Sequence, residues 1–145
     1  MAEPSSIWRT TPDAASLNAF LDDSLASHLE IRITEVGADF LTATMPVDAR
    51  TRQPFGILHG GASVVLSETL GSVAAYLTVD PATESAVGIE VNANHVRAAR
   101  SGWVVGTVRP LHVGRRTQVW QTHITDETGR LICVSRLTVA IVESL

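Results

Sequence analysis

The most constraining feature of this chain is an apolar run over residues 62–77 in which Glu68 is the only charged side chain. This length and composition predict a helix that is buried over most of its surface. A carboxylate within such a helix is costly unless it is hydrogen-bonded, protonated or used in chemistry. No Lys or Arg occurs between Arg52 and Arg97, so no helical neighbour can neutralise Glu68. Glu68 is therefore a candidate catalytic group.

The segment before this run reads Gln53-Pro-Phe-Gly-Ile-Leu-His59-Gly60-Gly61. Two glycines at the start of a helix leave backbone N–H groups open to a ligand, in a position where an oxyanion can be held. A carboxylate two turns further along the same helix then suggests acyl-transfer chemistry.

The length of 145 residues favours one domain spanning residues 1–145, with residues 1–25 as an N-terminal extension that carries a short helix. A content of 45% apolar and 18% charged residues is typical of a globular protein, and no uncharged stretch has the length of a membrane span. The polar first residues do not resemble a secretory signal, and one cysteine, Cys133, leaves no internal disulfide. We therefore expect a cytoplasmic protein that does not bind membranes.

Charge is unevenly distributed along the chain, whose net charge is -4. Residues 91–125 contain no Asp or Glu but contain three histidines and five arginines, namely Arg97, Arg100, Arg109, Arg115 and Arg116. A basic region within an acidic chain favours a small anionic ligand over a polyanion, so no nucleic-acid partner is expected.

The pattern of apolar residues predicts an α+β fold. Helical spacing marks residues 16–25 and 60–77, and strand-like runs occupy residues 31–36, 41–46, 86–97, 102–113, 117–125 and 131–142. One antiparallel sheet curled around the long apolar helix is the simplest way to bury both.

The motifs together resemble a known family. Residues 45–63, followed by Glu68-Thr-Leu-Gly-Ser72, are similar to hotdog-fold acyl-CoA thioesterases of the branch that acts on aromatic acyl-CoA. This branch includes hydroxybenzoyl-CoA thioesterases, the proofreading thioesterase of enterobactin synthesis and the dihydroxynaphthoyl-CoA hydrolase of menaquinone synthesis. Residues 88–97 and 110–120 most resemble the last of these. The resemblance implies a six-stranded antiparallel sheet wrapped around one long helix.

The resemblance also implies the catalytic roles. Glu68 would attack the thioester carbonyl or activate a water, and the Gly60 N–H would polarise the carbonyl oxygen with the help of the helix dipole. Gln53 would orient the substrate, and the hydroxyl of Ser72, one turn after Glu68, would hold a water or an oxygen of Glu68. His59 would contact the acyl ring or orient the site, although capping of the Gly-Gly turn is a simpler role for it.

The coenzyme A part of the substrate is expected at further residues. By resemblance these are Gly88, His95, Val96, Arg97, Ala98, His112, Val113, Gly114, Arg115, Arg116 and Thr117. The arginines among them suit phosphate groups. No cofactor is expected, because CoA belongs to the substrate and product. Hotdog domains pair through their sheets, so at least a homodimer and more often a homotetramer is expected, with Gln53 and Glu68 of one site drawn from different chains.

Several alternatives stay open at the level of sequence. The enzyme could hydrolyse a broad range of aroyl and medium-chain acyl-CoA esters, or it could remove misloaded groups from an aryl carrier protein. A non-catalytic acyl-CoA sensor is a different class, which the retention of Glu68 disfavours. A serine-hydrolase elbow and a metal-ligand spacing are both missing from the sequence. Trp103 stands where menaquinone-type relatives tend to carry a charged residue.

Overall fold

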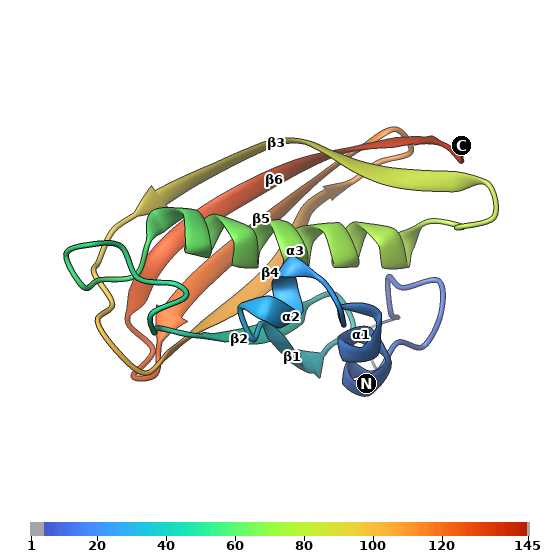
Figure 1. The fold of residues 1–145 in the computed structure, drawn as a ribbon. Coiled ribbons are helices and arrows are strands. Elements are labelled where there is room, and N and C mark those ends of the chain that lie inside the picture. The colour runs from blue at the N-terminus through green and yellow to red at the C-terminus, as the bar shows by residue number, and fades with distance from the viewer. Residues whose placement is uncertain (1–4, 145) are drawn as a thin grey trace.

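The computed structural model describes residues 5–144 and has one long helix lying along one face of a single curved sheet (Figure 1). The first four residues of the predicted N-terminal extension lie outside the described part. The helices are α1 (Ala14–Phe20), α2 (Leu25–His28) and α3 (Gly60–Thr78). The strands are β1 (Arg32–Val36), β2 (Leu41–Pro46), β3 (Glu84–His95), β4 (Trp103–Val113), β5 (Thr117–Asp126) and β6 (Leu131–Glu143).

The six strands form one sheet in the order β1-β2-β4-β5-β6-β3, and every neighbouring pair is antiparallel. β2 and β4 are neighbours in the sheet, although α3 and β3 lie between them in the chain. β3 is at the edge farthest from β1. The long loop and helix between β2 and β3 therefore cross the whole concave face of the sheet (Figure 1). The predicted α+β arrangement is confirmed.

The core lies between α3 and the sheet. Leu66, Leu70 and Ala74 on α3 are fully buried, as are Val108 on β4 and Trp120 on β5. On α3 the buried apolar residues recur at helical spacing, and on the strands they alternate with less buried ones. Each element therefore buries the face that its sequence predicts. α3 holds its catalytic candidates rigidly because it is packed along most of its length.

The predicted helix over residues 16–25 is wrong in its extent. The structure has two short helices, α1 and α2, separated by a turn in which Asp23 has a left-handed φ of 55°. Asp and Ser side chains favour turns and helix caps over helix interiors. Ser24 begins the second helix, where its N–H donates to the Ser27 Oγ at 3.1 Å. The break turns Phe20 and Leu25 toward the same cavity beside α3.

The N-terminal segment is part of the core. Trp8 is buried, stacks on Trp120 with ring centroids 6.1 Å apart, and donates through its indole N–H to the Gly37 carbonyl at 2.7 Å. The Arg9 N–H donates to the Leu77 carbonyl near the end of α3 at 2.9 Å. This segment therefore covers the C-terminal end of the long helix.

Candidate active site

Glu68 lies on the face of α3 that meets β3, and it is half-buried. Its Oε1 accepts a hydrogen bond from the Ser72 Oγ at 3.3 Å, one helical turn further along. A Cβ added at Gly88 on β3 would lie 2.6 Å from the same Oε1. None of the ion pairs found among residues 5–144 involves Glu68. The structure thus brings three predicted site residues, Glu68, Ser72 and Gly88, into direct contact without a neutralising cation.

A largely apolar cavity of about 430 Å³ opens beside this carboxylate. Glu68 and Ser72 line it together with side chains of the N-terminal helices and of α3, namely Phe20, Leu21, Leu25, Ala26, Val73 and Tyr76. The Phe20 and Tyr76 rings are nearly parallel, with centroids 5.6 Å apart and 9° between their planes. Phe20 is 62% exposed, so part of its ring surface is open at the mouth of this cavity. The cavity therefore has an aromatic pair in its wall and the Glu68 carboxylate in its lining.

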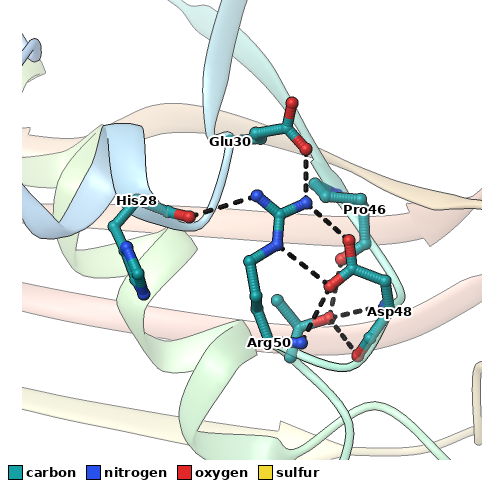
Figure 2. Close-up of polar contacts among 6 residues, drawn as sticks. His28, Glu30, Pro46, Asp48 and Arg50 are labelled. Carbon is teal, nitrogen blue, oxygen red and sulfur yellow. Dashed lines mark hydrogen bonds and ion pairs between the residues drawn. The ribbon is translucent and has the colours of Figure 1, made fainter.

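The loop that carries Gln53 is held in place by an arginine that connects it to the N-terminal part of the chain. Figure 2 shows Arg50 between Asp48, Glu30 and the carbonyl of His28. Its guanidinium donates to the Asp48 carboxylate at 2.5 Å, to the His28 carbonyl at 3.2 Å and to Glu30. The hydrogen bonds that the side chain and the backbone N–H of Arg50 donate to Asp48 hold the pKa of Asp48 below its ordinary value. The loop is thereby fixed at its start, close to β2.

Gln53 sits in a tight turn inside this loop. Its N–H donates to the Ile57 carbonyl and its own carbonyl accepts from the Gly56 N–H, both at 2.9 Å. Gly56 has a φ of 79°, a conformation that favours glycine. The side-chain Oε1 of Gln53 accepts from the Phe55 N–H. This bond uses the carbonyl oxygen of the amide and leaves both donors of its NH₂ group available, and Gln53 lines a cavity at the helix start.

His59 caps α3. Its Nδ1 accepts a hydrogen bond from the Gly61 N–H at 2.8 Å, which satisfies one of the free donors at the helix start. The Gly60 N–H, in contrast, has no acceptor within residues 5–144. The His95 ring lies over Gly60, where an added Cβ would come 2.8 Å from Nε2. The capping role considered for His59 is therefore observed, and Gly60 retains the donor that an oxyanion requires.

Gly60 opens into a second cavity of about 380 Å³. Its lining combines the loop, the helix start and the segment after β3, namely Gln53, Ile57, Leu58, Gly60, Ser63, His95, Val96, Arg97, Ala98 and Ile132. Arg97 is anchored there, since it donates to the Leu131 carbonyl at 2.9 Å. This cavity contains the predicted oxyanion donor and one of the two predicted CoA-binding segments.

One chain does not bring all the predicted site residues together. Glu68 follows Gly60 by eight residues of one straight helix, which separates them by about 12 Å along the axis. The two CoA-binding segments are also apart. His95 pairs with Cys133 on β6 and Thr117 pairs with Ala140, seven positions away, which corresponds to about 23 Å along the strand. Gly88 lies in the same row of the sheet as Gln118, at the hairpin that contains residues 112–117.

Two further observations concern metal ligands and membrane spans. Among residues 5–144, no group of three or more His, Cys, Asp or Glu side chains is placed to hold a metal ion. No helix in the same range is both long enough and apolar enough to cross a membrane.

Comparison with known proteins identifies the class of enzyme. Residues 55–133 match the thioesterase superfamily. The chain belongs to this superfamily. A 1,4-dihydroxy-2-naphthoyl-CoA hydrolase of Escherichia coli (strain K12) is 56% identical over 135 residues, which cover 93% of this chain and 98% of the relative. The proofreading thioesterase EntH of Cronobacter turicensis is 50% identical, with 93% and 98% covered.

A solved structure supports the same assignment for the fold of this thioesterase. A crystal structure of a mutant of the thioesterase PA1618 from Pseudomonas aeruginosa superposes with a TM-score of 0.93 at 51% identity, covering 95% of this chain and 99% of that chain. The hotdog fold and the thioesterase class predicted from the motifs are thus confirmed. The roles of the individual residues in this thioesterase remain predictions.

Sequence reasoning missed several residues that lie in or around the two cavities of this thioesterase. Phe20 and Tyr76 pair across two helices, and no local pattern links residues so far apart in the chain. Arg50 lies in a charged stretch whose partners are visible only in three dimensions. Ser63 lines the cavity at Gly60. A signal for Ser63 existed, because it is one of few hydroxyl groups in the apolar run and follows Gly60 by three residues.

Proposed function

We propose that this thioesterase hydrolyses aromatic acyl-CoA esters to the free acid and CoA, with 1,4-dihydroxy-2-naphthoyl-CoA as the leading substrate. The observation that carries the proposal is the contact of Glu68 with an apolar cavity that holds two parallel aromatic rings. A flat acyl group stacked near Phe20 and Tyr76 would present its thioester carbonyl to the carboxylate. The 56% identity to a hydrolase of that name supports the bicyclic acyl group.

The chemistry follows from the groups present. The Glu68 carboxylate attacks the thioester carbon, or takes a proton from a water that does so, while the Ser72 hydroxyl holds its Oε1 in place. Negative charge then develops on the thioester oxygen. The Gly60 N–H is available to stabilise this charge at the positive end of α3, and the Gln53 amide lies in the same cavity. If Glu68 attacks, the thiolate of CoA leaves and water then cleaves the mixed anhydride between Glu68 and the acyl group. If water attacks, departure of the thiolate gives the acid directly.

One active site would combine two chains. Gly60 and Glu68 of one chain are held apart by the rigid helix, so a thioester carbonyl that contacts both groups would have to lie between two protomers. β3 is an edge strand with Val87 and Ile89 exposed, which makes it the surface through which two sheets would join. Antiparallel pairing of β3 with its copy would bring the Gly60 end of one chain toward Glu68 of the other. We propose a homodimer at minimum and a homotetramer as the complete assembly.

The CoA portion would occupy the remaining predicted residues. Val96, Arg97 and Ala98 lie beside the Gly60 cavity, and exposed Arg115 and Arg116 belong to the β4–β5 hairpin. Their separation in one chain is compatible with a nucleotide bound across the interface, where the hairpin comes from the partner. The reaction is proposed to need no cofactor, so activity should survive treatment with EDTA. The single buried cysteine suits the reducing cytoplasm, where we place the enzyme.

Release of CoA thiol, measured with a disulfide dye, tests the activity. Wild type and Glu68→Gln are compared on benzoyl-, dihydroxynaphthoyl-, hexanoyl- and palmitoyl-CoA. We expect the highest kcat/KM on the bicyclic aromatic ester and a loss of orders of magnitude in Glu68→Gln, with unchanged thermal unfolding. Near-normal turnover by Glu68→Gln would remove Glu68 from the mechanism. Equal rates on benzoyl- and hexanoyl-CoA would favour a broad-specificity hydrolase.

Mixing two inactive variants tests whether the site is shared between chains. Gln53→Ala and Glu68→Gln each damage both sites of their own dimer, but a mixed dimer has one site without either substitution. Unfolding and refolding an equimolar mixture should recover roughly a quarter of wild-type activity if subunits pair at random. No recovery, with mixed dimers present, would place Gln53 and Glu68 of one site in the same chain.

Proofreading of aryl carrier proteins is the second candidate, because the chain is 50% identical to a proofreading thioesterase. The two substrates differ only beyond the phosphopantetheine arm, which both share. Hydrolysis of one acyl group presented on CoA and on a purified aryl carrier protein separates them. A kcat/KM that is much higher on the carrier would favour proofreading. Binding of all these esters without hydrolysis would indicate a sensor.

A further inference from the structure

Two serine hydroxyl groups are buried in α3 without a hydrogen-bond partner. Ser63 and Ser67 are each 1% exposed, and the Oγ of each has no partner within residues 5–144. A buried hydroxyl that makes no hydrogen bond is unfavourable for folding. A buried serine within a helix can bond to the carbonyl one turn earlier, which neither serine does here. An unpaired group that persists in a core suggests a role that begins when a ligand binds.

The two serines differ in what they face. Ser63 lines the cavity that also contains Gly60 and Gln53, whereas Ser67 lines neither this cavity nor the one beside Glu68. Ser63 follows Gly60 by three residues, so both lie on the same face of α3. Helical side chains lean toward the helix N-terminus, which directs the Ser63 Oγ back toward Gly60. Its hydroxyl is therefore near the place where the free Gly60 N–H points.

We propose that Ser63 is a second hydrogen-bond donor to the thioester carbonyl oxygen, acting with the Gly60 N–H on the oxyanion that forms when the carbonyl is attacked. This inference rests on the proposed thioester hydrolysis. The Ser63 O–H rotates to donate to the substrate oxygen, and no bond to Ser63 is made or broken. Because the hydroxyl is already desolvated in the free enzyme, it loses little on meeting the substrate and contributes more as negative charge develops. Ser63 would thus be a catalytic residue.

Ser63→Ala and Ser67→Ala form a matched pair for the test. Both remove a buried hydroxyl without a partner, so both variants should fold and should be as stable as wild type or more stable. We expect Ser63→Ala to lose about a hundred-fold in kcat on the best acyl-CoA ester, with KM little changed, as for loss of an oxyanion donor. Ser67→Ala should keep wild-type kcat. Of the two variants, only Ser63→Ala would then lose kcat while its stability stays the same or rises.

The outcomes separate this inference from the proposed function. If wild type is active and Ser63→Ala matches Ser67→Ala in kcat, the role of Ser63 is overturned and the thioesterase assignment stands. A rise in KM with unchanged kcat in Ser63→Ala would also overturn it, because it would indicate ordinary substrate binding. If wild type releases no thiol from any acyl-CoA, the proposed function itself fails. The predicted loss of kcat at Ser63 alone would support the second donor.

Discussion

The carboxylate of Glu68 occupies the space that a side chain at Gly88 would need. Glu68 comes from α3 and Gly88 from the edge strand β3, and an added Cβ would lie 2.6 Å from Oε1. The carboxylate is the flexible end of its side chain, so it would move rather than the backbone. The observed position of the Glu68 carboxylate therefore depends on glycine at residue 88, whereas the backbone conformation there does not call for glycine.

Gly88→Ala should accordingly impair activity much more than stability. We expect kcat to fall by about 10- to 100-fold, because a displacement of about 1 Å at a catalytic group has effects of that size. The melting temperature should change little. Gly71→Ala is the control, since its Cβ would meet Leu137 at 2.6 Å in the core and would affect packing instead. Full activity in Gly88→Ala would mean that Glu68 tolerates the displacement.

His59 is predicted to stabilise the start of α3. Removing its Nδ1 acceptor in His59→Ala leaves the Gly61 N–H without its cap and should lower the free energy of unfolding by about 1 kcal/mol. His59→Asn keeps a side-chain acceptor suited to the cap position and should restore most of the loss. Urea denaturation of the three proteins measures this difference. Equal unfolding midpoints for the Ala and Asn variants would show that the cap has no energetic role.

Phe20 is predicted to select aromatic acyl groups. The ring is exposed, so Phe20→Ala should fold normally while it removes half of the stacked pair with Tyr76. We expect kcat/KM for benzoyl-CoA to fall by about 3- to 10-fold relative to cyclohexanecarbonyl-CoA, which has a ring of similar size that is not flat. Phe20→Tyr keeps the stacking surface and should behave like wild type. An equal loss on both esters would indicate a role in access rather than selection.

The loss of folding stability at acidic pH should depend on Arg50. Its hydrogen bonds lower the pKa of Asp48 from 3.8, so near that pH the native protein binds fewer protons than the unfolded chain. This contribution to stability is present above about pH 4 and is lost as the pH falls through the lower native pKa. Arg50→Met should reduce the change in urea midpoint between pH 5 and pH 3. A variant with the same acid dependence as wild type would contradict the assignment.

Cys133 is predicted to be unreactive in the folded protein. Burial raises the pKa of its thiol, so the nucleophilic thiolate is scarce at neutral pH. A disulfide dye should detect no enzyme thiol under native conditions and one per chain in denaturant. This result matters for the thiol-release assay, because the enzyme would then add no background. Rapid labelling of the native protein would show that β6 opens on the timescale of the assay.

The sequence predicted those parts of the fold that depend on local periodicity. The apolar run located α3 to within one residue, and the strand-like runs located β1, β2, β4, β5 and β6 to within one residue at each end. The prediction for β3 was wrong by two residues at each end, since residues 86–97 were expected and the strand is Glu84–His95. Local patterns did not detect the turn at Asp23, since Leu25 continues the helical spacing of Leu17 and Leu21 across it. They also did not reveal that Trp8 reaches Trp120, because a contact between distant segments leaves no periodic signal.

In the candidate site, too, the sequence predicts local spacing but not contacts between distant segments. Gly60, Glu68 and Ser72 lie on one helix, so their spacing alone places them relative to one another. Their distribution between two cavities depends on the loop at Gln53 and on the helices that carry Phe20 and Leu25, which only the tertiary structure shows. The unpaired hydroxyl of Ser63 is likewise a property of packing. It is visible only when every possible partner has been placed.

The stacking of Trp8 on Trp120 has a consequence for how the protein folds. The two rings come from distant parts of the chain, and Trp120 lies on β5, which is paired with β4 on one side and β6 on the other. Contacts between segments so far apart in the chain form slowly, because the entropic cost of closing the intervening loop has to be met before the contact stabilises the protein. We therefore expect the N-terminal segment that carries Trp8 to dock last, onto a sheet that is already assembled. Indole fluorescence would record that docking as the final kinetic phase of refolding, after the secondary structure is complete.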